Sequence, residues 1–345
     1  MIHRRHALTG LGAATLALGL PAGARQPQPR SKLPPRLRPG DTVGLVKPAG
    51  FIADDFDLQL AVEAITAMGL KPKLARHLTD RFGYLAGKDR DRAADLNAMY
   101  ADPEVKAVFA ARGGWGSARL LPFLDFRTIR ANPKLLIGFS DITALHMAFA
   151  AHAGFPTIHG PNAGSAWGKL SVNAFRELVF EGQLPHYRNP PGDEDRLVQR
   201  ENRTQIIRPG KASGRLLGGN LTVLSALVGT PYLPSFDGAI LFLEDVDEAE
   251  YRIDRMLTQL ALAGVLRKVN AVVFGQCTNC RGEGPSYGGF TLGQVLRQHL
   301  EPLGVPAYQG ALFGHIDDQF SLPVGARAEI DATEGTIRLL ESPVG

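Results

Sequence analysis

The sequence predicts an α/β protein with a mostly parallel sheet. In its first half, short apolar runs typical of buried strands alternate with segments of helical spacing. Strands that alternate with helices in this way form parallel sheets with helices on both faces. A second series of strands and helices follows a polar, proline-rich stretch, and 345 residues suffice for one large or two medium domains. We therefore expect two α/β domains.

Start and stop signals define the elements of the first half. The helix expected at 55–68 ends before Gly69, and Asp102-Pro103 ends the helix expected at 90–100. The other elements expected in this half are strands at 41–46, 70–74, 105–111 and 135–139 and helices at 117–124 and 141–153.

The middle of the chain separates the two halves. It is polar and contains Pro190-Pro191-Gly192, a composition that indicates a linker with one short helix. We place the first domain at 35–165, the linker at 166–208 and the second domain at 209–345. The elements expected in the second domain are helices at 221–228, 251–263 and 292–299 and strands at 239–243, 271–274, 306–310 and 326–330.

Residues 1–24 have the pattern of an export signal. Arg4-Arg5 precedes an uncharged, largely apolar stretch at 7–22, and Ala22-Gly23-Ala24 is an A-x-A-type cleavage site. The apolar stretch is short for a membrane span, which needs about 20 residues. We expect cleavage after Ala24 and a periplasmic product, exported by the twin-arginine route or by general export.

Charge and hydropathy exclude two classes of partner. The signal holds two arginines and no acid, so its removal lowers the formal net charge from +4 to +2. That charge is too small to indicate nucleic-acid binding, and basic runs with interleaved aromatic residues are absent from the sequence. No later segment is a long uninterrupted apolar run, so we expect no stable membrane insertion.

The two cysteines, Cys277 and Cys280, could form a disulfide in an oxidising compartment. A thioredoxin-like redox site would place them at the start of a helix, but here they lie between a predicted strand and a loop. A zinc site would need two more ligands, and neither a second Cys pair nor an H-x-x-x-H pattern occurs. We expect no metal and no cofactor.

The segment around Ser140 is the strongest chemical signal in the chain. The apolar run Leu135-Leu-Ile-Gly-Phe139 ends at Ser140, and a helical stretch follows at once. A strand, tight turn and helix with a serine at the corner expose its hydroxyl beside free helix N–H groups, which can hold an oxyanion. Ile142 replaces the second glycine of the usual G-x-S-x-G pattern, and a serine here could also simply cap the helix.

A nucleophilic serine needs a base, and that base needs an orienting group. Active-site groups of α/β folds cluster at the carboxyl ends of strands. Spacing alone leaves the base open between His159 and His315, which both follow strands. The orienter is open too, because four acids follow the strand at 239–243: Glu244, Asp245, Asp247 and Glu248. That acidic cluster could equally be a solvated loop that caps the next helix.

A glycine-rich loop, Arg112-Gly-Gly-Trp-Gly116, follows the strand at 105–111. It lacks the lysine of a phosphate-binding loop and the third glycine of a dinucleotide fingerprint. We expect Gly113 and Gly114 to let backbone N–H groups approach a reacting carbonyl.

Six separated motifs resemble the LD-carboxypeptidase family of serine peptidases, in the right order from about Pro35 to the C-terminus. They are Arg112-Gly-Gly-Trp-Gly-Ser-Ala-Arg-Leu-Leu-Pro122, Asn132-Pro-Lys-Leu-Leu-Ile-Gly-Phe-Ser140-Asp-Ile-Thr-Ala-Leu-His146, His159-Gly-Pro161, Gly218-Gly-Asn220, Leu241-Phe-Leu-Glu-Asp245 with Tyr251-Arg-Ile-Asp-Arg-Met-Leu257, and Phe313-Gly-His315.

The resemblance implies a site and a fold. By position, Ser140 is the nucleophile, His315 the general base and Glu244 the orienter of a metal-free triad. The N–H of Asp141 and an N–H of the Gly113-Gly114 loop would form the oxyanion hole, and Trp115, where the family often has tyrosine, would be an apolar wall for the substrate. The fold would join a flavodoxin- or Rossmann-like domain that carries Ser140 to an α/β domain with a small barrel-like sheet. Family members are often dimers, so we expect a homodimer.

The resemblance also implies a reaction, the release of C-terminal D-alanine from murein tetrapeptides. One alternative is a relative in the same family that cleaves peptidyl or aminoacyl nucleotides and confers immunity to such antibiotics. We rank it second because the middle segment offers Trp167 and few other aromatic residues for a nucleobase. A binding protein without catalysis is a third alternative, but it would not need Ser140, Glu244 and His315 together.

Overall fold

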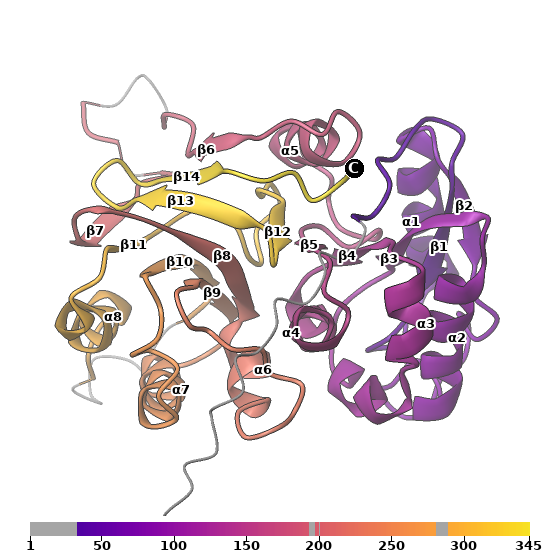
Figure 1. Ribbon diagram of the computed structural model, residues 1–345, viewed down its shortest axis with the longest axis horizontal. Helices are drawn as coiled ribbons and strands as arrows, with labels where there is room; N and C mark the ends of the chain where they lie inside the picture. The colour runs from indigo at the N-terminus through magenta and orange to yellow at the C-terminus, as the bar shows by residue number, and fades with distance from the viewer. Residues whose placement is uncertain (1–32, 193–196, 200, 281–288) are drawn as a thin grey trace, which may run out of the picture. The chain divides into compact units, whose positions relative to one another are not determined.

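Two sheets carry the fold in the computed structural model, which describes residues 33–192, 197–199, 201–280 and 289–345 (Figure 1). Both sheets lie in one compact unit with a continuous hydrophobic core. The expected export signal lies outside the described residues. None of the described helices is long and apolar enough to cross a membrane.

The first sheet has six strands in the order β12-β5-β4-β3-β1-β2. Its five parallel strands come from the first half of the chain: β1 (Thr42–Val46), β2 (Lys71–Leu74), β3 (Val105–Ala110), β4 (Leu135–Gly138) and β5 (Thr157–His159). The helices of this half are α1 (Asp55–Ala67), α2 (Asp89–Ala101), α3 (Phe126–Ala131), α4 (Thr143–His152) and the 3-10 helix η1 (Ser117–Phe123). The expected parallel α/β architecture is therefore confirmed.

The second sheet has eight strands in the order β6-β14-β13-β8-β9-β10-β11-β7. Its parallel centre is formed by β8 (Lys211–Asn220), β9 (Ile240–Val246), β10 (Ala271–Thr278) and β11 (Ala307–Gln309). Antiparallel strands flank this centre: β7 (Gln205–Arg208), β13 (Arg327–Asp331), β14 (Thr336–Leu339) and β6 (His186–Arg188). Figure 1 shows α6 (Leu221–Ala226), α7 (Glu250–Leu262) and α8 (Leu292–Leu300) on one side of the parallel strands and β13 and β14 on the other.

Strand β8 makes this arrangement possible. Its first half, 211–215, pairs antiparallel with β13, whereas its second half, 216–220, pairs parallel with β9. β8 is not among the strands expected from the sequence. Its second half contains Gly218 and Gly219, and glycine is depleted in strands.

The segment expected as a linker, 166–208, contributes to both parts of the fold. It contains α5 (Lys169–Val179), whose apolar face is buried, and the two edge strands of the eight-stranded sheet, β6 and β7. These strands have only three and four residues, too few to show an alternating pattern. Conversely β12 (Leu322–Val324), from the expected second domain, pairs antiparallel with β5 of the first sheet.

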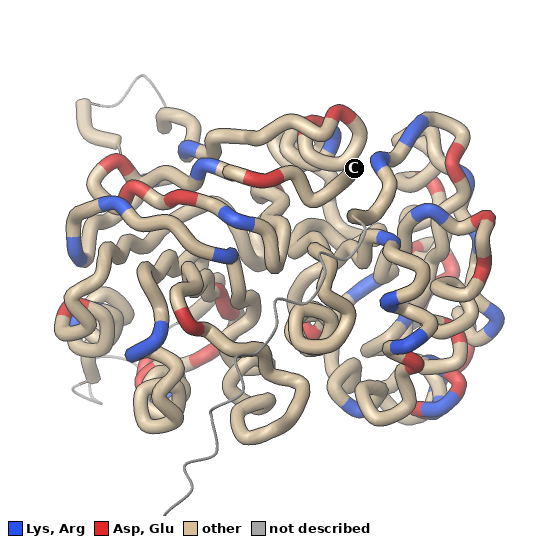
Figure 2. The backbone as a smooth tube through the Cα atoms, viewed as in Figure 1, with Lys and Arg blue, Asp and Glu red and all other residues tan. Residues whose placement is uncertain are grey.

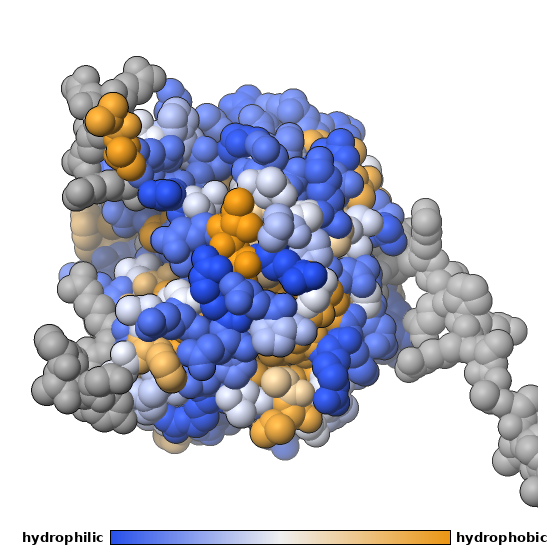
Figure 3. Space-filling model, turned by 90° about the vertical axis from the view of Figure 1, so that its left-hand side faces the viewer, coloured by the Kyte–Doolittle hydropathy of each residue, from blue (hydrophilic) through white to orange (hydrophobic). Residues whose placement is uncertain are grey.

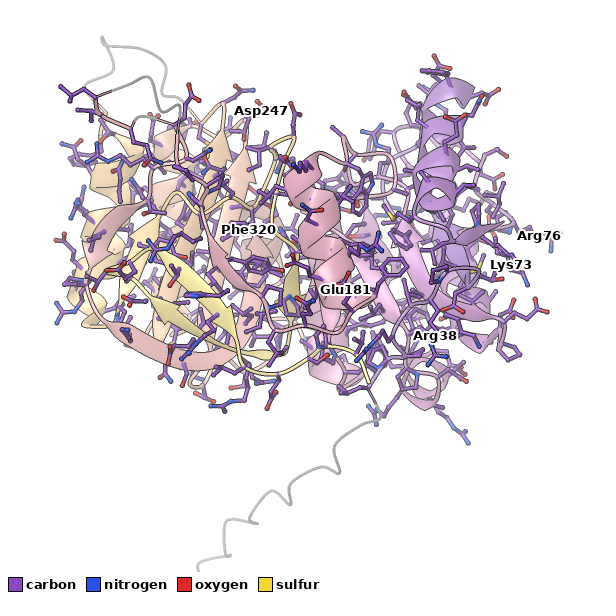
Figure 4. The ribbon with its side chains drawn as sticks, turned by 90° about the horizontal axis from the view of Figure 1, so that it is seen from above. Arg38, Lys73, Arg76, Glu181, Asp247 and Phe320 are labelled. Atoms are coloured by element: carbon purple, nitrogen blue, oxygen red, sulfur yellow. A yellow bond between two sulfur atoms is a disulfide. The ribbon has the colours of Figure 1, made fainter. Side chains whose placement is uncertain are left out.

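Aromatic stacking holds in place the segment just before β12, which passes from one sheet to the other. Phe320, labelled in Figure 4, stacks on Tyr187 of β6 with ring centroids 4.6 Å apart. The Tyr187 hydroxyl donates to the carbonyl of Ser321 at 2.8 Å. The chain just before β12 is therefore held between the two sheets.

Charged side chains of both signs are interspersed along the backbone. Figure 2 shows Lys and Arg next to Asp and Glu on most elements, most densely on the helices around the six-stranded sheet. In this view no continuous band of one sign crosses the molecule.

Candidate active site

Ser140 lies at a sharp turn between β4 and the short 3-10 helix η2 (Ser140–Ile142) that leads into α4. Its φ is 66°, in the left-handed region that residues other than glycine seldom adopt. Gly138 at the end of β4 also needs to be glycine, since its φ is 155° and a Cβ there would lie 2.7 Å from Oδ1 of Asn162. Strain of this kind concentrates at functional sites.

Ser140, His315 and Glu244 form one hydrogen-bonded line. The Oγ of Ser140 lies 2.8 Å from Nε2 of His315, and Nδ1 of His315 lies 2.7 Å from Oε2 of Glu244. Glu244 is in β9 and fully buried, whereas the side chain of His315, in the loop after β11, is 20% exposed. The sheets thus bring together residues that are 175 and 71 positions apart in the chain.

Two opposing effects act on the protonation of His315. Burial lowers its pKa, but the hydrogen bond and negative charge of Glu244 raise it, as do the charges of Asp245 and Asp247. The pKa of His315 is raised overall, because the carboxylates outweigh the loss of solvent. In this geometry a neutral imidazole can accept the proton of a serine hydroxyl, and a carboxylate on its other nitrogen can stabilise the resulting imidazolium.

Buried polar groups hold the turn from behind. Nε2 of His146 lies 2.8 Å from the carbonyl of Gly138, and its Nδ1 lies 2.8 Å from Oγ1 of Thr157. Burial lowers the pKa of His146 to about 4, so this residue stays neutral and serves as a structural link. The N–H of Phe139 donates to Oδ1 of Asn162 at 3.3 Å.

The glycine-rich loop packs directly against Ser140. A Cβ on Gly113 would lie 2.9 Å from Cβ and 3.1 Å from Oγ of Ser140, so only glycine fits there. Within the described residues, the N–H groups of Gly113 and Gly114 donate no hydrogen bond, which leaves them free for a ligand. The buried side chain of Asp141 fastens this loop to the turn, because it accepts the N–H of Ser117 at 2.7 Å.

Trp115 lies at the rim of the loop and is 54% exposed. Its ring meets that of Tyr84 edge to face at 5.5 Å. Both side chains expose apolar surface beside the glycine-rich loop.

The rival residues of the sequence analysis have other surroundings. His159 is fully buried among aromatic rings, and neither ring nitrogen has a partner among the described residues. Asp245 is buried and accepts hydrogen bonds from Asn220 and Thr222, and burial raises its pKa to about 6. Asp247 is exposed, and Glu248 lies 3.5 Å from Arg252. None of these side chains bonds to Ser140 or His315.

Two supporting residues escaped the sequence analysis. The hydroxyl of Thr143, at the start of α4, accepts the N–H of Asn220 at 2.9 Å and so joins β8 to the helix that follows Ser140. The hydroxyl of Thr278, at the end of β10, donates to the carbonyl of His315 at 2.6 Å. The available signal was position: Thr143 begins the helix after the turn at Ser140, and Thr278 ends a strand. Next to Thr278, Cys277 and Cys280 form a disulfide.

No group of His, Cys, Asp or Glu ligand atoms that could hold a metal ion includes a triad residue, among the residues that the structure describes. Among the described residues, His77, Asp80 and Asp91 form the group whose ligand atoms lie within 4.8 Å of one another. None of them belongs to the triad, and Nδ1 of His77 pairs with Asp80 at 3.0 Å.

Two family models match the chain in consecutive order. The LD-carboxypeptidase N-terminal domain matches residues 43–160, and the LD-carboxypeptidase C-terminal domain matches residues 213–330. The first match contains Ser140, and the second contains Glu244 and His315.

Relatives and solved structures agree with these matches. A murein tetrapeptide carboxypeptidase of Pseudomonas aeruginosa is 33% identical over 295 residues, which are 84% of this chain and 92% of that protein. The crystal structure of muramoyltetrapeptide carboxypeptidase from Oxalobacter formigenes has a TM-score of 0.74 and 31% identity, over 86% of this chain and 97% of the other. The structure of MccF in complex with glutamyl sulfamoyl guanosine has a TM-score of 0.82 and 25% identity, over 91% and 99%.

Proposed function

Since this chain belongs to the LD-carboxypeptidase family of serine peptidases, we propose that it releases the C-terminal D-alanine of murein tetrapeptides. The observation that carries the proposal is the hydrogen-bonded line from Ser140 Oγ through His315 to Glu244, at 2.8 Å and 2.7 Å. The named activities of the Pseudomonas and Oxalobacter relatives supply the substrate class.

The geometry supports a two-step acyl transfer. His315 takes the proton of Ser140 as the hydroxyl attacks the carbonyl before D-alanine. The N–H of Asp141 and an N–H of Gly113 or Gly114 stabilise the oxyanion of the tetrahedral intermediate. His315 then gives its proton to the leaving amine, D-alanine departs, and an acyl ester remains on Ser140. Water activated at His315 hydrolyses this ester and restores the serine.

Hydrolysis of aminoacyl nucleotides is the second candidate. Its support is the fold likeness to MccF, which was solved with glutamyl sulfamoyl guanosine. The same triad could act on either substrate, so substrates must distinguish the two candidates.

The deciding experiment measures D-alanine release from L-Ala-γ-D-Glu-diaminopimelate-D-Ala by the unaltered chain and by Ser140→Ala, each with and without EDTA. We expect release that survives EDTA and is lost in Ser140→Ala. If the unaltered chain releases no D-alanine, the proposal fails and aminoacyl nucleotides are tested next. Release by Ser140→Ala would mean that another residue is the nucleophile.

We also propose that the enzyme acts in the periplasm. The pattern of residues 1–24 supports export, and the Cys277–Cys280 disulfide is of a kind that persists in oxidising compartments. Cell fractionation and N-terminal sequencing test this, with a mature protein that begins at Arg25 as the expected result.

A homodimer is proposed on the family resemblance. Figure 3 shows that the face at the left of Figure 1 is mostly hydrophilic, with small separated apolar areas on the coloured atoms. We therefore expect the dimer interface to lie on another face. Light scattering after size exclusion should give twice the mass of the mature chain.

A further inference from the structure

Lys47 is a buried cation without a partner. It is the first residue after β1 and only 4% exposed. Within the part of the chain that the structure describes, its ammonium makes no hydrogen bond, and no carboxylate lies within 4.0 Å of it. Burial lowers the pKa of Lys47, a nearby Asp80 partly offsets this, and Arg112 lowers it further. Asp80 itself pairs with His77, at 3.0 Å.

Arg112 is a second cation at the same place. It follows β3, the strand next to β1, and its Nη1 donates to the carbonyl of Phe51 at 3.0 Å. No described carboxylate pairs with it. Two other arginines of this region are already engaged with Asp89: Arg119 donates to it from Nε and Nη2, at 2.9 Å and 2.8 Å, and Arg92 from Nη2, at 2.6 Å.

Burying the unpaired charge of Lys47 is costly, and Arg112, an exposed residue, adds a second charge of the same sign near it. A ligand of opposite charge would offset this cost. Lys47 and Arg112 therefore indicate a site for an anion.

This pair lies beside the nucleophile. Strands β1, β3 and β4 are neighbours in the sheet, and Lys47, Arg112 and Ser140 follow their carboxyl ends. Adjacent strands are about 4.8 Å apart, so the backbones of β1 and β4 are separated by roughly 10 Å. Gly113, next to Arg112, packs on Ser140, and Gly50 donates its N–H to the carbonyl of Gly113 at 3.2 Å.

We propose that Lys47 and Arg112 form the subsite for the free carboxylate of the substrate's C-terminal residue. The inference rests on the proposed function and deepens it. The carboxylate of a terminal D-alanine is only two bonds beyond the scissile amide nitrogen. When the scissile carbonyl lies at Ser140, this carboxylate can therefore reach the neighbouring strand ends. Such a subsite makes the enzyme specific for chain ends, because an amidated or extended peptide lacks the negative charge there.

The test compares the tetrapeptide acid with its C-terminal amide, and the tripeptide product is quantified in both reactions. Four proteins are measured: the unaltered chain, Lys47→Met, Arg112→Gln and the control Lys73→Met. Lys73 is in β2 of the same sheet, at the side opposite the eight-stranded sheet in Figure 4, and pairs with Asp102 at 2.5 Å and Glu104 at 3.3 Å.

We expect the unaltered chain and Lys73→Met to prefer the acid by about ten-fold or more in kcat/KM, as charge-assisted hydrogen bonds imply. Lys47→Met and Arg112→Gln should lose this preference, mainly through a higher KM for the acid, with kcat/KM for the amide within about two-fold of the unaltered chain. Lys47→Met should melt no lower than the unaltered chain, since replacing an unpaired buried charge by an apolar side chain is neutral or stabilising.

An acid preference that Lys47→Met and Arg112→Gln retain would overturn the subsite while the proposed function stands. A Lys47→Met protein that melts at a clearly lower temperature would also overturn it, because Lys47 would then be a structural residue. Failure of the unaltered chain to form any tripeptide would refute the proposed function and the subsite together.

Discussion

Replacement of Ser140 by glycine and by alanine separates the backbone of the turn from the chemistry of the hydroxyl. Both variants lose the bond from Oγ to His315, so they differ mainly in how they tolerate the φ of 66°. Both should be inactive. Only the glycine variant should relieve the strain.

The size of the difference follows from the backbone. A left-handed conformation costs an L-residue about 1–2 kcal/mol. Relief of this strain by glycine is partly offset, by about 0.5–1 kcal/mol, because glycine makes the unfolded chain more flexible. We therefore expect Ser140→Gly to be more stable than Ser140→Ala by about 0.5–1 kcal/mol.

Differential scanning calorimetry on the two variants measures this difference. A change of 1 kcal/mol shifts Tm by about 2–4 °C in chains of 150–250 residues, so a rise of roughly 1–3 °C is expected in this longer chain. If Ser140→Gly melts at or below the temperature of Ser140→Ala, the turn at Ser140 is not strained.

Three further changes probe the site and its supports. The Glu244→Gln variant keeps the shape of the side chain but removes the charge that raises the pKa of His315. Its kcat should fall by at least about a hundred-fold. Its activity should also persist to lower pH, because His315 must be neutral to act as base and loss of the Glu244 charge lowers the pKa of His315. An unchanged acid limb in the pH–rate profile would contradict this role. The Gly113→Ala variant should lose at least about ten-fold in kcat with Tm within a few degrees, because its Cβ would lie 2.9 Å from that of Ser140; full activity would show that the loop can move away. The Asp318→Ala variant removes two hydrogen bonds, at 3.1 Å and 2.6 Å, to free N–H groups at the start of α5, and chemical denaturation should show a loss of about 1 kcal/mol; an unchanged midpoint would mean that water replaces this cap.

The parallel sheet was predictable because its strands are buried on both faces. The run of buried residues in β3 and β4 is apolar almost throughout, and a helix follows each strand, so local pattern and final structure agree. The expected helix at 117–124 is a 3-10 helix at Ser117–Phe123 with Pro122 inside, because proline cannot donate the bond that an α-helix needs.

The rest of the fold depends on pairing between distant segments. Strands β6, β7 and β12 have three or four residues, and only their partners define them. The position of β12 beside β5 could not be read from local periodicity, because the two strands are more than 160 residues apart. For the same reason the bounds of the two domains stay a prediction.

The site residues also differ in whether the local sequence could predict them. Ser140 has a local signal in its strand, turn and helix, whereas spacing left His159 and His315 equal as the base. Family resemblance favoured His315, and the structure brings this residue to Ser140 because β4 and the loop after β11 meet. Lys47 had only a weak sequence signal, a single lysine at the end of an apolar strand. Only the structure shows that no described carboxylate lies close enough to pair with it.

The most direct test of the central claim is to trap the acyl-enzyme. The tetrapeptide is mixed with the unaltered chain, the reaction is quenched in acid within milliseconds, and the protein is digested and examined by mass spectrometry. We predict that L-Ala-γ-D-Glu-diaminopimelate is found as an ester on Ser140, and that it is absent from Ser140→Ala. An adduct on another residue, or D-alanine release by a chain whose Ser140 is never acylated, would contradict the account.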